Sequence, residues 1–207
     1  MRAILVAALL LVAPACDAAT MTQPAPEYRP EEAGTIDHAL CLLGFTAVPL
    51  RRTSTTGHHL VEARLNGREG LFVLDTGANL SVVDDDYAAQ FGLSARGARP
   101  GGGFAIGGEV SASQVRIDSL VLGGVSVRQR NIVVANLSQL TAAMRPLAGG
   151  HVHGLIGQDV LNEHRAVIDV ARPILYLIAA DEEPGPVPAE RCRGTADEAS
   201  ANSTENP

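Results

Sequence analysis

The chain has 207 residues, enough for one domain with a sizeable core and additional segments at its ends. Its net charge of −7, without a basic stripe interleaved with aromatic residues, excludes the electrostatic footprint of a nucleic-acid-binding protein. Hydrophobic residues make up 46% of the chain and aromatic residues only 3%, so Val, Leu, Ile and Ala must fill the core, which favours a β-rich or mixed interior.

Residues 1–19 are typical of an export signal. One basic residue precedes an apolar segment that is too short to span a bilayer, and the small-residue pattern Ala13-Pro14-Ala15 follows. Cys16 comes next, which resembles a bacterial lipoprotein processing site, although Ala13 stands where Leu is usual. We therefore expect an exported protein of the periplasm or cell envelope, with or without a lipid anchor at Cys16, and contact with a membrane only through that anchor.

Two segments flank the predicted domain. Residues 20–44 are rich in Pro, Glu and small residues and indicate a linker, with a short helix or turn near residues 36–43. Residues 181–207 have almost no large apolar side chains and indicate a disordered tail. Cys41 and Cys192 either close a long loop as a disulfide in an oxidising compartment or remain two unpaired thiols.

Residues 45–180 show short β-branched segments separated by turns, a pattern typical of an all-β barrel or sandwich. The clearest element is a hairpin over 59–74 that turns at Asn66-Gly67. Two short helices are expected, one over 84–93 and one after Gly157. Further strands are expected within 113–124, 125–137 and 166–178, the last bent at Arg172-Pro173.

Asp75 ends an apolar run in "LFVLDTGANLSVVD", residues 71–84. An isolated carboxylate in a low dielectric is costly, so its position requires hydrogen-bond donors or a chemical role. Thr76 can stabilise a turn at the strand end through its hydroxyl, and Gly77 permits close approach of the backbone. The tripeptide alone is most often a simple turn that ends a strand.

The wider context resembles the retropepsin-like aspartic proteases. Their pattern is a strand, an Asn-Gly hairpin, a second apolar strand and Asp-Thr-Gly-Ala, which "LVEARLNGREGLFVLDTGANLSVV" follows throughout. The family also has a later hydrophobic-hydrophobic-Gly element, then a short helix and a final hairpin, and "HGLIGQDVLNEHRAVIDVARPILYL" with Leu155, Ile156 and Gly157 is similar to it. The resemblance spans about residues 45–178 and is strongest to the bacterial branch. It implies an all-β fold, the closed β-barrel of the acid proteases, with one or two short helices.

The resemblance further implies an aspartic endopeptidase. In this family two facing carboxylates share a proton and activate one water, without a cofactor. The chain has a single Asp-Thr-Gly, so the resemblance implies a homodimer that brings Asp75 of each copy to the axis, acting on a peptide or protein substrate. Thr76, Gly77 and Ala78 would support the site, with Thr76 forming hydrogen bonds across the axis. Ala78 stands where pepsin-like enzymes have Ser, which predicts a less acidic pH optimum than that of pepsin.

Proteins of this family also cover the substrate with a hairpin flap. The glycine-rich residues 99–115 are the candidate, with its centre at Gly103, Phe104, Ala105, Ile106 and Gly107, and a plain glycine-rich loop is the alternative. One departure from the bacterial relatives is His153, because they often carry an acid at this position. The local pKa values and the pH optimum would differ accordingly.

Other chemistries have little support. His58-His59 and His151-x-His153 lack partner Cys or Glu residues at ligand spacing, and the acidic run 84–86 lacks the alternating spacing of a calcium loop, so no metal is expected. No G-x-S-x-G motif of serine hydrolases occurs. The main alternative to the protease is a catalytically inactive retropepsin-fold binding or scaffold module of the cell envelope. A lipoprotein scaffold that makes contacts through its acidic tail is a further alternative.

Overall fold

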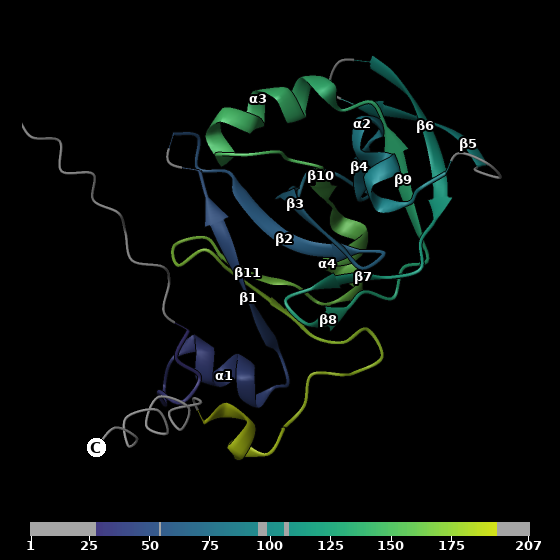
Figure 1. Cartoon of the computed structure of the whole chain (residues 1–207). Helices are drawn as coiled ribbons and strands as arrows, with labels where there is room; N and C mark the ends of the chain where they lie inside the picture. Colours follow the sequence, from purple (N-terminus) through teal and green to yellow (C-terminus); the bar gives the residue numbers. More distant parts are fainter. Residues whose placement is uncertain (1–27, 54, 95–98, 106–107, 194–207) are drawn as a thin grey trace, which may run out of the picture.

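A computed structural model describes residues 28–53, 55–94, 99–105 and 108–193 of the chain (Figure 1). For residues 99–105 and 108–110 the description covers the backbone. The predicted export signal, Cys16 and residues 194–207 lie outside the described residues, as do Ile106 and Gly107 of the predicted flap. Within the described ranges, none of the helices has the length and apolar character needed to cross a membrane.

The described chain is mostly β-structure, with four α-helices and two short 3-10 helices. The elements in chain order are α1 (Ile36–Leu42), β1 (Thr46–Arg52), β2 (His59–Leu65), β3 (Arg68–Leu74), β4 (Val82–Asp84), α2 (Asp85–Ala88), η1 (Ala89–Phe91), β5 (Arg99–Ala105), β6 (Gly108–Arg116), β7 (Leu120–Leu122), β8 (Val125–Ser126), β9 (Asn131–Ala135), α3 (Ser138–Ala148), β10 (Gly154–Ile156), α4 (Gln158–Glu163), β11 (Val167–Asp169), β12 (Ile174–Leu177) and η2 (Ala189–Cys192).

Twelve strands of the described chain form one sheet, in the order β11-β12-β1-β2-β3-β10-β4-β9-β6-β5, with β7 paired to β2 and β8 to β7. The short strand β10 lies between β3, to which it is parallel, and β4, to which it is antiparallel. Strands β11 and β5 each pair with one neighbour among the described residues, so the sheet has two open ends. Closure into a barrel, which the resemblance implies, is therefore not confirmed.

The predicted hairpin over residues 59–74 is present as β2 and β3. Asn66 and Gly67 have φ values of 49° and 76°, which a tight turn between two twisted strands requires. The predicted bend at Arg172-Pro173 is also present, between β11 and β12. The largest core cluster contains Phe72 of β3 with Phe91, Ile156 and Leu177, and the rings of Phe72 and Phe91 lie 6.0 Å apart. The Asn66-Gly67 turn and the Arg172-Pro173 bend, unlike this packing, follow from local sequence pattern alone.

The helices exceed the one or two that the resemblance implies. The helices predicted over 84–93 and after Gly157 correspond to α2 with η1, and to α4. Helix α3 is not predicted, because Pro146 lies inside it and the sequence before it indicates a strand. Met144 and Ala148 of α3 pack on Leu60 and Val73, so tertiary burial stabilises this helix over the face of β2 and β3 (Figure 1).

A disulfide between Cys41 of α1 and Cys192 of η2 connects two ends of the described chain. Its Cα atoms are 5.8 Å apart, and 151 residues separate the two cysteines in sequence. The backbone N–H groups of Gly185 and Val187 also donate to the carbonyls of Leu43 and Leu42. Residues 181–193, which lie in the predicted disordered tail, therefore pack beside α1 instead, near the base of Figure 1.

Asp37 of α1 is the centre of a buried polar network at the same end of the molecule. Its carboxylate, on a side chain only 1% exposed, accepts hydrogen bonds from Arg172 Nη1 at 2.8 Å, from the Arg29 N–H at 3.0 Å and from the Tyr176 hydroxyl. Burial favours the neutral acid, but the Arg172, Tyr176 and Arg29 donors outweigh it and lower the pKa of Asp37. Arg172 Nε also pairs with Asp169 at 2.8 Å, so the network joins α1 to the β11–β12 hairpin.

Candidate active site

Asp75 lies directly after β3, at the beginning of the loop that leads to β4. Its N–H donates to the Ile156 carbonyl of β10 at 3.0 Å, which continues the pairing of β3 with β10 by one residue. The Gly77 N–H donates to Asp75 Oδ1 at 2.9 Å, and the Ala78 N–H donates to the Asp75 carbonyl at 3.3 Å. Within one chain the acid is half-buried rather than buried, and Thr76 and Gly77 are exposed. The apolar strand therefore ends before the acid, which faces the surface of the chain.

The second predicted motif lies against this loop. Leu155 and Ile156 are buried in β10, and Gly157 follows them at the start of α4. A Cβ atom at Gly157 would lie 2.6 Å from the Leu80 carbonyl oxygen and 2.8 Å from that of Ala78. Only glycine allows the two backbones to approach this closely. The structure thus brings together the two motifs that the sequence analysis selected.

Ser81 and Asp159 connect the end of the loop to α4. The Ser81 hydroxyl donates to Asp159 Oδ1 at 2.7 Å, and its N–H donates to Oδ2 at 2.9 Å. The same hydroxyl accepts the Gly157 N–H at 3.0 Å. Ser81 could not be identified from the sequence, because it lies in an apolar segment and no local pattern relates it to an acid 78 residues later.

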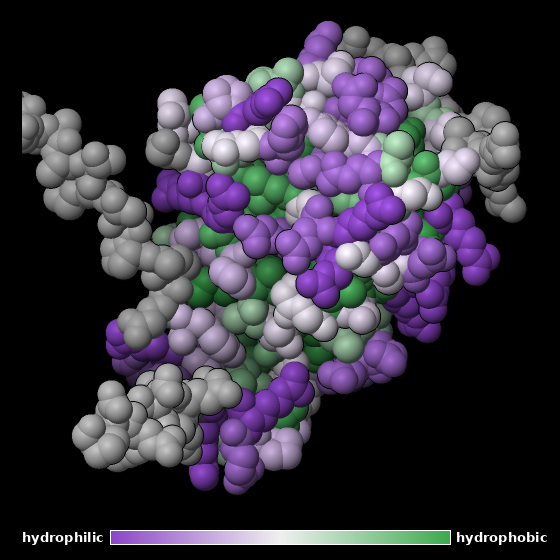
Figure 2. Space-filling model, in the orientation of Figure 1, coloured by the Kyte–Doolittle hydropathy of each residue, from purple (hydrophilic) through white to green (hydrophobic). Residues whose placement is uncertain are grey.

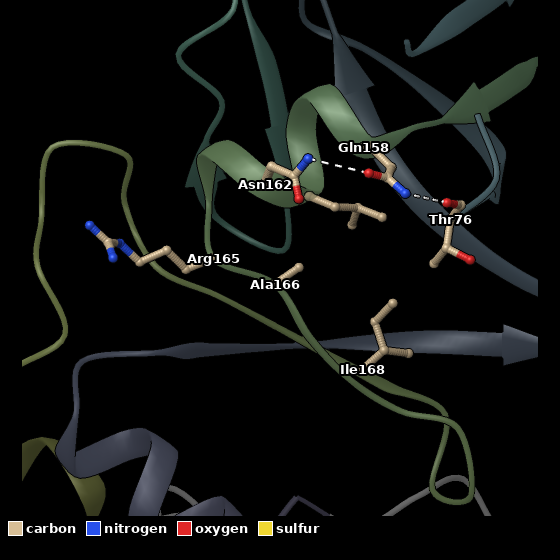
Figure 3. Close-up of a pocket in the computed structure, with 7 residues that line it drawn as sticks. Thr76, Gln158, Asn162, Arg165, Ala166 and Ile168 are labelled. Atoms are coloured by element: carbon tan, nitrogen blue, oxygen red, sulfur yellow. Dashed lines mark hydrogen bonds between the residues drawn. The ribbon is translucent and has the colours of Figure 1, made fainter. Parts of the chain in front are cut away.

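Helix α4 also contacts the middle of the loop. The N–H groups of Gln158 and Asp159 donate to the carbonyls of Ala78 and Asn79 at 2.8 and 3.1 Å. The Gln158 side chain donates from Nε2 to the Thr76 carbonyl at 2.6 Å (Figure 3). These first N–H groups of a helix have no partners within the helix itself, so the loop carbonyls satisfy them.

An open hollow of about 400 Å³ lies beside the loop, between α4 and β11 (Figure 3). Its lining combines apolar side chains with polar ones: Thr76, Gln158, Leu161, Asn162, Arg165, Ala166 and Ile168. Another exposed apolar side chain is Leu80, on the loop itself and 51% exposed. On the face in Figure 2, hydrophobic residues reach the surface below α3, between hydrophilic patches.

His153 does not contact the Asp75 loop. Its Nδ1 accepts the Leu71 N–H at 3.1 Å, and its ring packs on Tyr87 and Phe91. Burial lowers the pKa of His153 and outweighs the opposing effect of the Leu71 backbone contact, and the nearby His151 contributes in the same direction as burial. In the described chain the contacts of His153 are with β3, α2 and η1. Having His153 where bacterial relatives often have an acid would therefore influence the pH optimum only indirectly.

The predicted flap region forms a hairpin of β5 and β6 at one open end of the sheet. The backbone pairs Phe104 with Glu109 and Ala105 with Gly108. Gly103 pairs with Val110, while Ile106 and Gly107 lie outside the described residues. The hairpin is thus present where the sequence predicts it, and its role as a flap stays a prediction.

Among the described residues, the acids Asp84, Asp85 and Asp86 have ligand atoms within 4.8 Å of one another. The Asp84 carboxylate, however, accepts hydrogen bonds from the Leu137 N–H at 3.0 Å and the Thr141 hydroxyl at 2.7 Å. Asp84 is fully buried, while Asp85 and Asp86 are exposed. The geometry indicates an acid that stabilises the start of α3 rather than a cation site.

A β-rich domain in which an Asp-Thr-Gly loop packs on a Leu-Ile-Gly strand has the features of an aspartic protease. Residues 61–160 match the family of aspartyl proteases, and this segment includes both motifs. The match covers just under half of the chain and bears out the resemblance to the retropepsin-like aspartic proteases. No curated protein matches the chain.

Two solved structures are similar to the chain at low sequence identity. A retropepsin-like aspartic protease from Rickettsia conorii is 20% identical, with a TM-score of 0.46 over 65% of this chain and 98% of that chain. EIAV protease complexed with the inhibitor HBY-793 is 17% identical, with a TM-score of 0.40 over 53% of this chain and 90% of that chain. Both TM-scores are below 0.5, so the family assignment depends on the sequence match.

Proposed function

We propose that the protein is an aspartic endopeptidase that hydrolyses peptide bonds, with one Asp75 from each of two copies forming the catalytic pair. The observation that carries this proposal is the setting of Asp75. Its loop is fixed to β10 and α4 by hydrogen bonds, yet the carboxylate stays half-exposed at the surface of the chain. A rigid acid that faces outward is suited to meet a second acid from another copy.

The chemistry requires two carboxylates that share one proton. One Asp75 accepts a proton from water as the water oxygen attacks the scissile carbonyl carbon, and the protonated Asp75 of the other copy donates to the carbonyl oxygen. The C–N bond then breaks as the first Asp75 gives its proton to the leaving nitrogen and a hydroxyl of the tetrahedral intermediate returns a proton to the second Asp75, which yields a carboxyl end and an amine end. Two like charges a few ångströms apart do not both ionise readily, so the pair keeps one proton over a range of pH.

A C2 homodimer is the arrangement that supplies the second acid, because the chain has one Asp-Thr-Gly. Exposed Thr76 and Leu80 on the loop support this proposal. Within the described residues the Thr76 hydroxyl has no hydrogen-bond partner, so it is available to the equivalent residue across the axis. The β5–β6 hairpin would cover a peptide bound over Asp75.

We also propose export to the periplasm or cell envelope. The apolar N-terminal segment supports it, and the Cys41–Cys192 disulfide is typical of an oxidising compartment. Lipid attachment at Cys16 is a separate proposal, which metabolic labelling with a radioactive fatty acid tests: wild type incorporates label, and Cys16→Ser does not. Absence of label on the wild-type protein would refute lipid attachment at Cys16 and would leave the proposal of export unaffected.

The decisive experiment compares wild type with Asp75→Asn on a peptide library from pH 3 to pH 8, together with the mass of each protein in solution. We expect cleavage and a dimer mass for wild type, and loss of cleavage for Asp75→Asn. Asp118→Asn, which changes an exposed acid far along the chain, serves as the control and retains activity. Equal cleavage by wild type and Asp75→Asn would refute the assignment. A monomer that binds peptides without cleaving them would favour the inactive binding module instead.

A further inference from the structure

We infer that Gln158 is a positioning residue for the Asp75 loop: its side-chain amide orients the peptide group between Thr76 and Gly77, and Asn162 orients that amide. The inference rests on the proposed function and extends it to residues of α4 that do not touch the substrate.

The geometry forms a relay of two hydrogen bonds. Asn162 Nδ2 donates to Gln158 Oε1 at 3.3 Å, and Gln158 Nε2 donates to the Thr76 carbonyl at 2.6 Å (Figure 3). Residues 158 and 162 are four apart on one helix and therefore lie on the same face. Because Asn162 is a donor to Oε1, the Gln158 amide presents its nitrogen to the loop.

The relay reaches the proposed catalytic acid through one planar peptide group. The Thr76 carbonyl and the Gly77 N–H belong to the same trans peptide, so fixing the direction of the carbonyl fixes the direction of the N–H. The Gly77 N–H is the donor to Asp75 Oδ1 at 2.9 Å. Gly77 has no Cβ, so rotation of this peptide costs little unless a partner restrains it. Gln158 is that partner.

The rest of the loop has other partners. The backbone of α4 binds the carbonyls of Ala78 and Asn79, and Asp159 binds Ser81. Within the described chain, the Gln158 side chain is the partner of the Thr76 carbonyl. Loss of the Gln158 amide would therefore leave the loop in place and release one peptide group beside Asp75.

The test uses Gln158→Leu, Gln158→Glu and Asn162→Leu, with Gln139→Leu as a control at an exposed glutamine of α3. For Gln158→Leu we expect kcat/KM to fall about threefold to tenfold, the effect of one lost hydrogen bond. Asn162→Leu should show a smaller loss of kcat/KM, and Gln139→Leu none. A purely structural role of Gln158 would lower stability without the pH-dependent rescue that is expected of Gln158→Glu.

Gln158→Glu gives a conditional rescue. A charged carboxylate cannot donate to the Thr76 carbonyl, whereas a protonated one can. Its activity relative to wild type should therefore rise as the pH falls toward 4, where a glutamate begins to protonate. Arg165 also lines the hollow, but its guanidinium pairs with Glu183 and points away from Gln158 (Figure 3). A ratio that does not change with pH would count against the inference.

A readout independent of activity separates this inference from the proposed function. Hydrogen exchange of the Gly77 amide, followed by NMR, should be at least about threefold faster in Gln158→Leu than in wild type, because the donor loses its alignment. The exchange of buried strand amides should be unchanged, which shows that the fold is retained. Unchanged Gly77 exchange would overturn the inference even if the protein is a protease. Faster exchange in a protein that cleaves nothing would instead refute the proposed function.

Discussion

Ser81 and Asp159 are joined by two hydrogen bonds, from the Ser81 N–H at 2.9 Å and from its hydroxyl at 2.7 Å, although 78 residues separate them. The same hydroxyl accepts the Gly157 N–H. This contact fixes the far end of the Asp75 loop to the helix that follows the second motif.

Ser81→Ala should destabilise the protein by about 1–3 kcal/mol, because it leaves the buried Gly157 N–H without its acceptor and removes one of the two donors to Asp159 Oδ1. Urea unfolding measures this loss, and the exposed Ser126→Ala in β8 is the control, with a change of less than about 0.5 kcal/mol. We also expect kcat/KM to fall by more than the loss of folded protein would explain, because the loop carries Asp75. A Ser81→Ala protein of wild-type stability would contradict the prediction.

Gly157→Ala should displace the loop, because the added Cβ would lie 2.6 Å from the Leu80 carbonyl oxygen. Overpacking of this kind typically costs about 1–3 kcal/mol, and the misplaced acid should reduce activity about 100-fold. Gly150→Ala is the matched control, since its Cβ would meet no atom within 4 Å. If the two variants have equal thermal stability and activity, the close approach at Gly157 has no functional importance.

Asp37→Asn should destabilise the protein by about 2–3 kcal/mol, less than for a fully buried ion pair because Arg172 is 35% exposed. The pKa of Asp37 is lowered in the folded state. Its contribution is therefore complete above the unfolded pKa of about 3.9 and disappears as the pH falls through the lower folded value. Denaturant unfolding at several pH values should show the gap between wild type and Asp37→Asn closing below about pH 4. A constant gap at all pH values would exclude a contribution from the ionised carboxylate.

Reduction of the Cys41–Cys192 disulfide should lower the free energy of unfolding by about 2–5 kcal/mol, because the bond constrains a long loop in the unfolded chain. Thermal unfolding with and without a thiol reductant measures the effect. The double variant Cys41→Ser and Cys192→Ser should have the stability of the reduced protein whether or not reductant is present. Sensitivity of that double variant to reductant would point to another cause.

His153 should make the protein less stable as the pH falls through about 6.5, since burial lowers the pKa of His153 and the unfolded chain binds the proton more readily. His153→Asn retains an acceptor near the Leu71 N–H but cannot titrate, so its stability should change less from pH 7.5 to pH 5.5. The exposed His58→Asn should behave as wild type. The prediction is wrong if the free energy of unfolding decreases by the same amount in His153→Asn and in wild type over this pH range.

Several elements could be predicted because their signals are local. The Asn66-Gly67 turn and the two helices after the motifs depend on a few neighbouring residues. Helix α3 could not be predicted, because Met144 and Ala148 become buried only against β2 and β3, and Pro146 argues against a helix. The extent of the tail also depends on a distant contact, since Cys192 is placed by its bond to Cys41.

The sequence by itself determined the strand and turn pattern, the two motifs and the family, because backbone preferences and motif spacing are encoded within short segments. Only the tertiary structure decided that β10 lies between β3 and β4, so that Gly157 meets the loop of Asp75. It also decided that Asp75 is half-exposed and that Ser81, Gln158 and Asp159 fix its loop. These contacts join residues about 80 positions apart, and no local preference encodes a pairing that depends on the packing of the whole sheet.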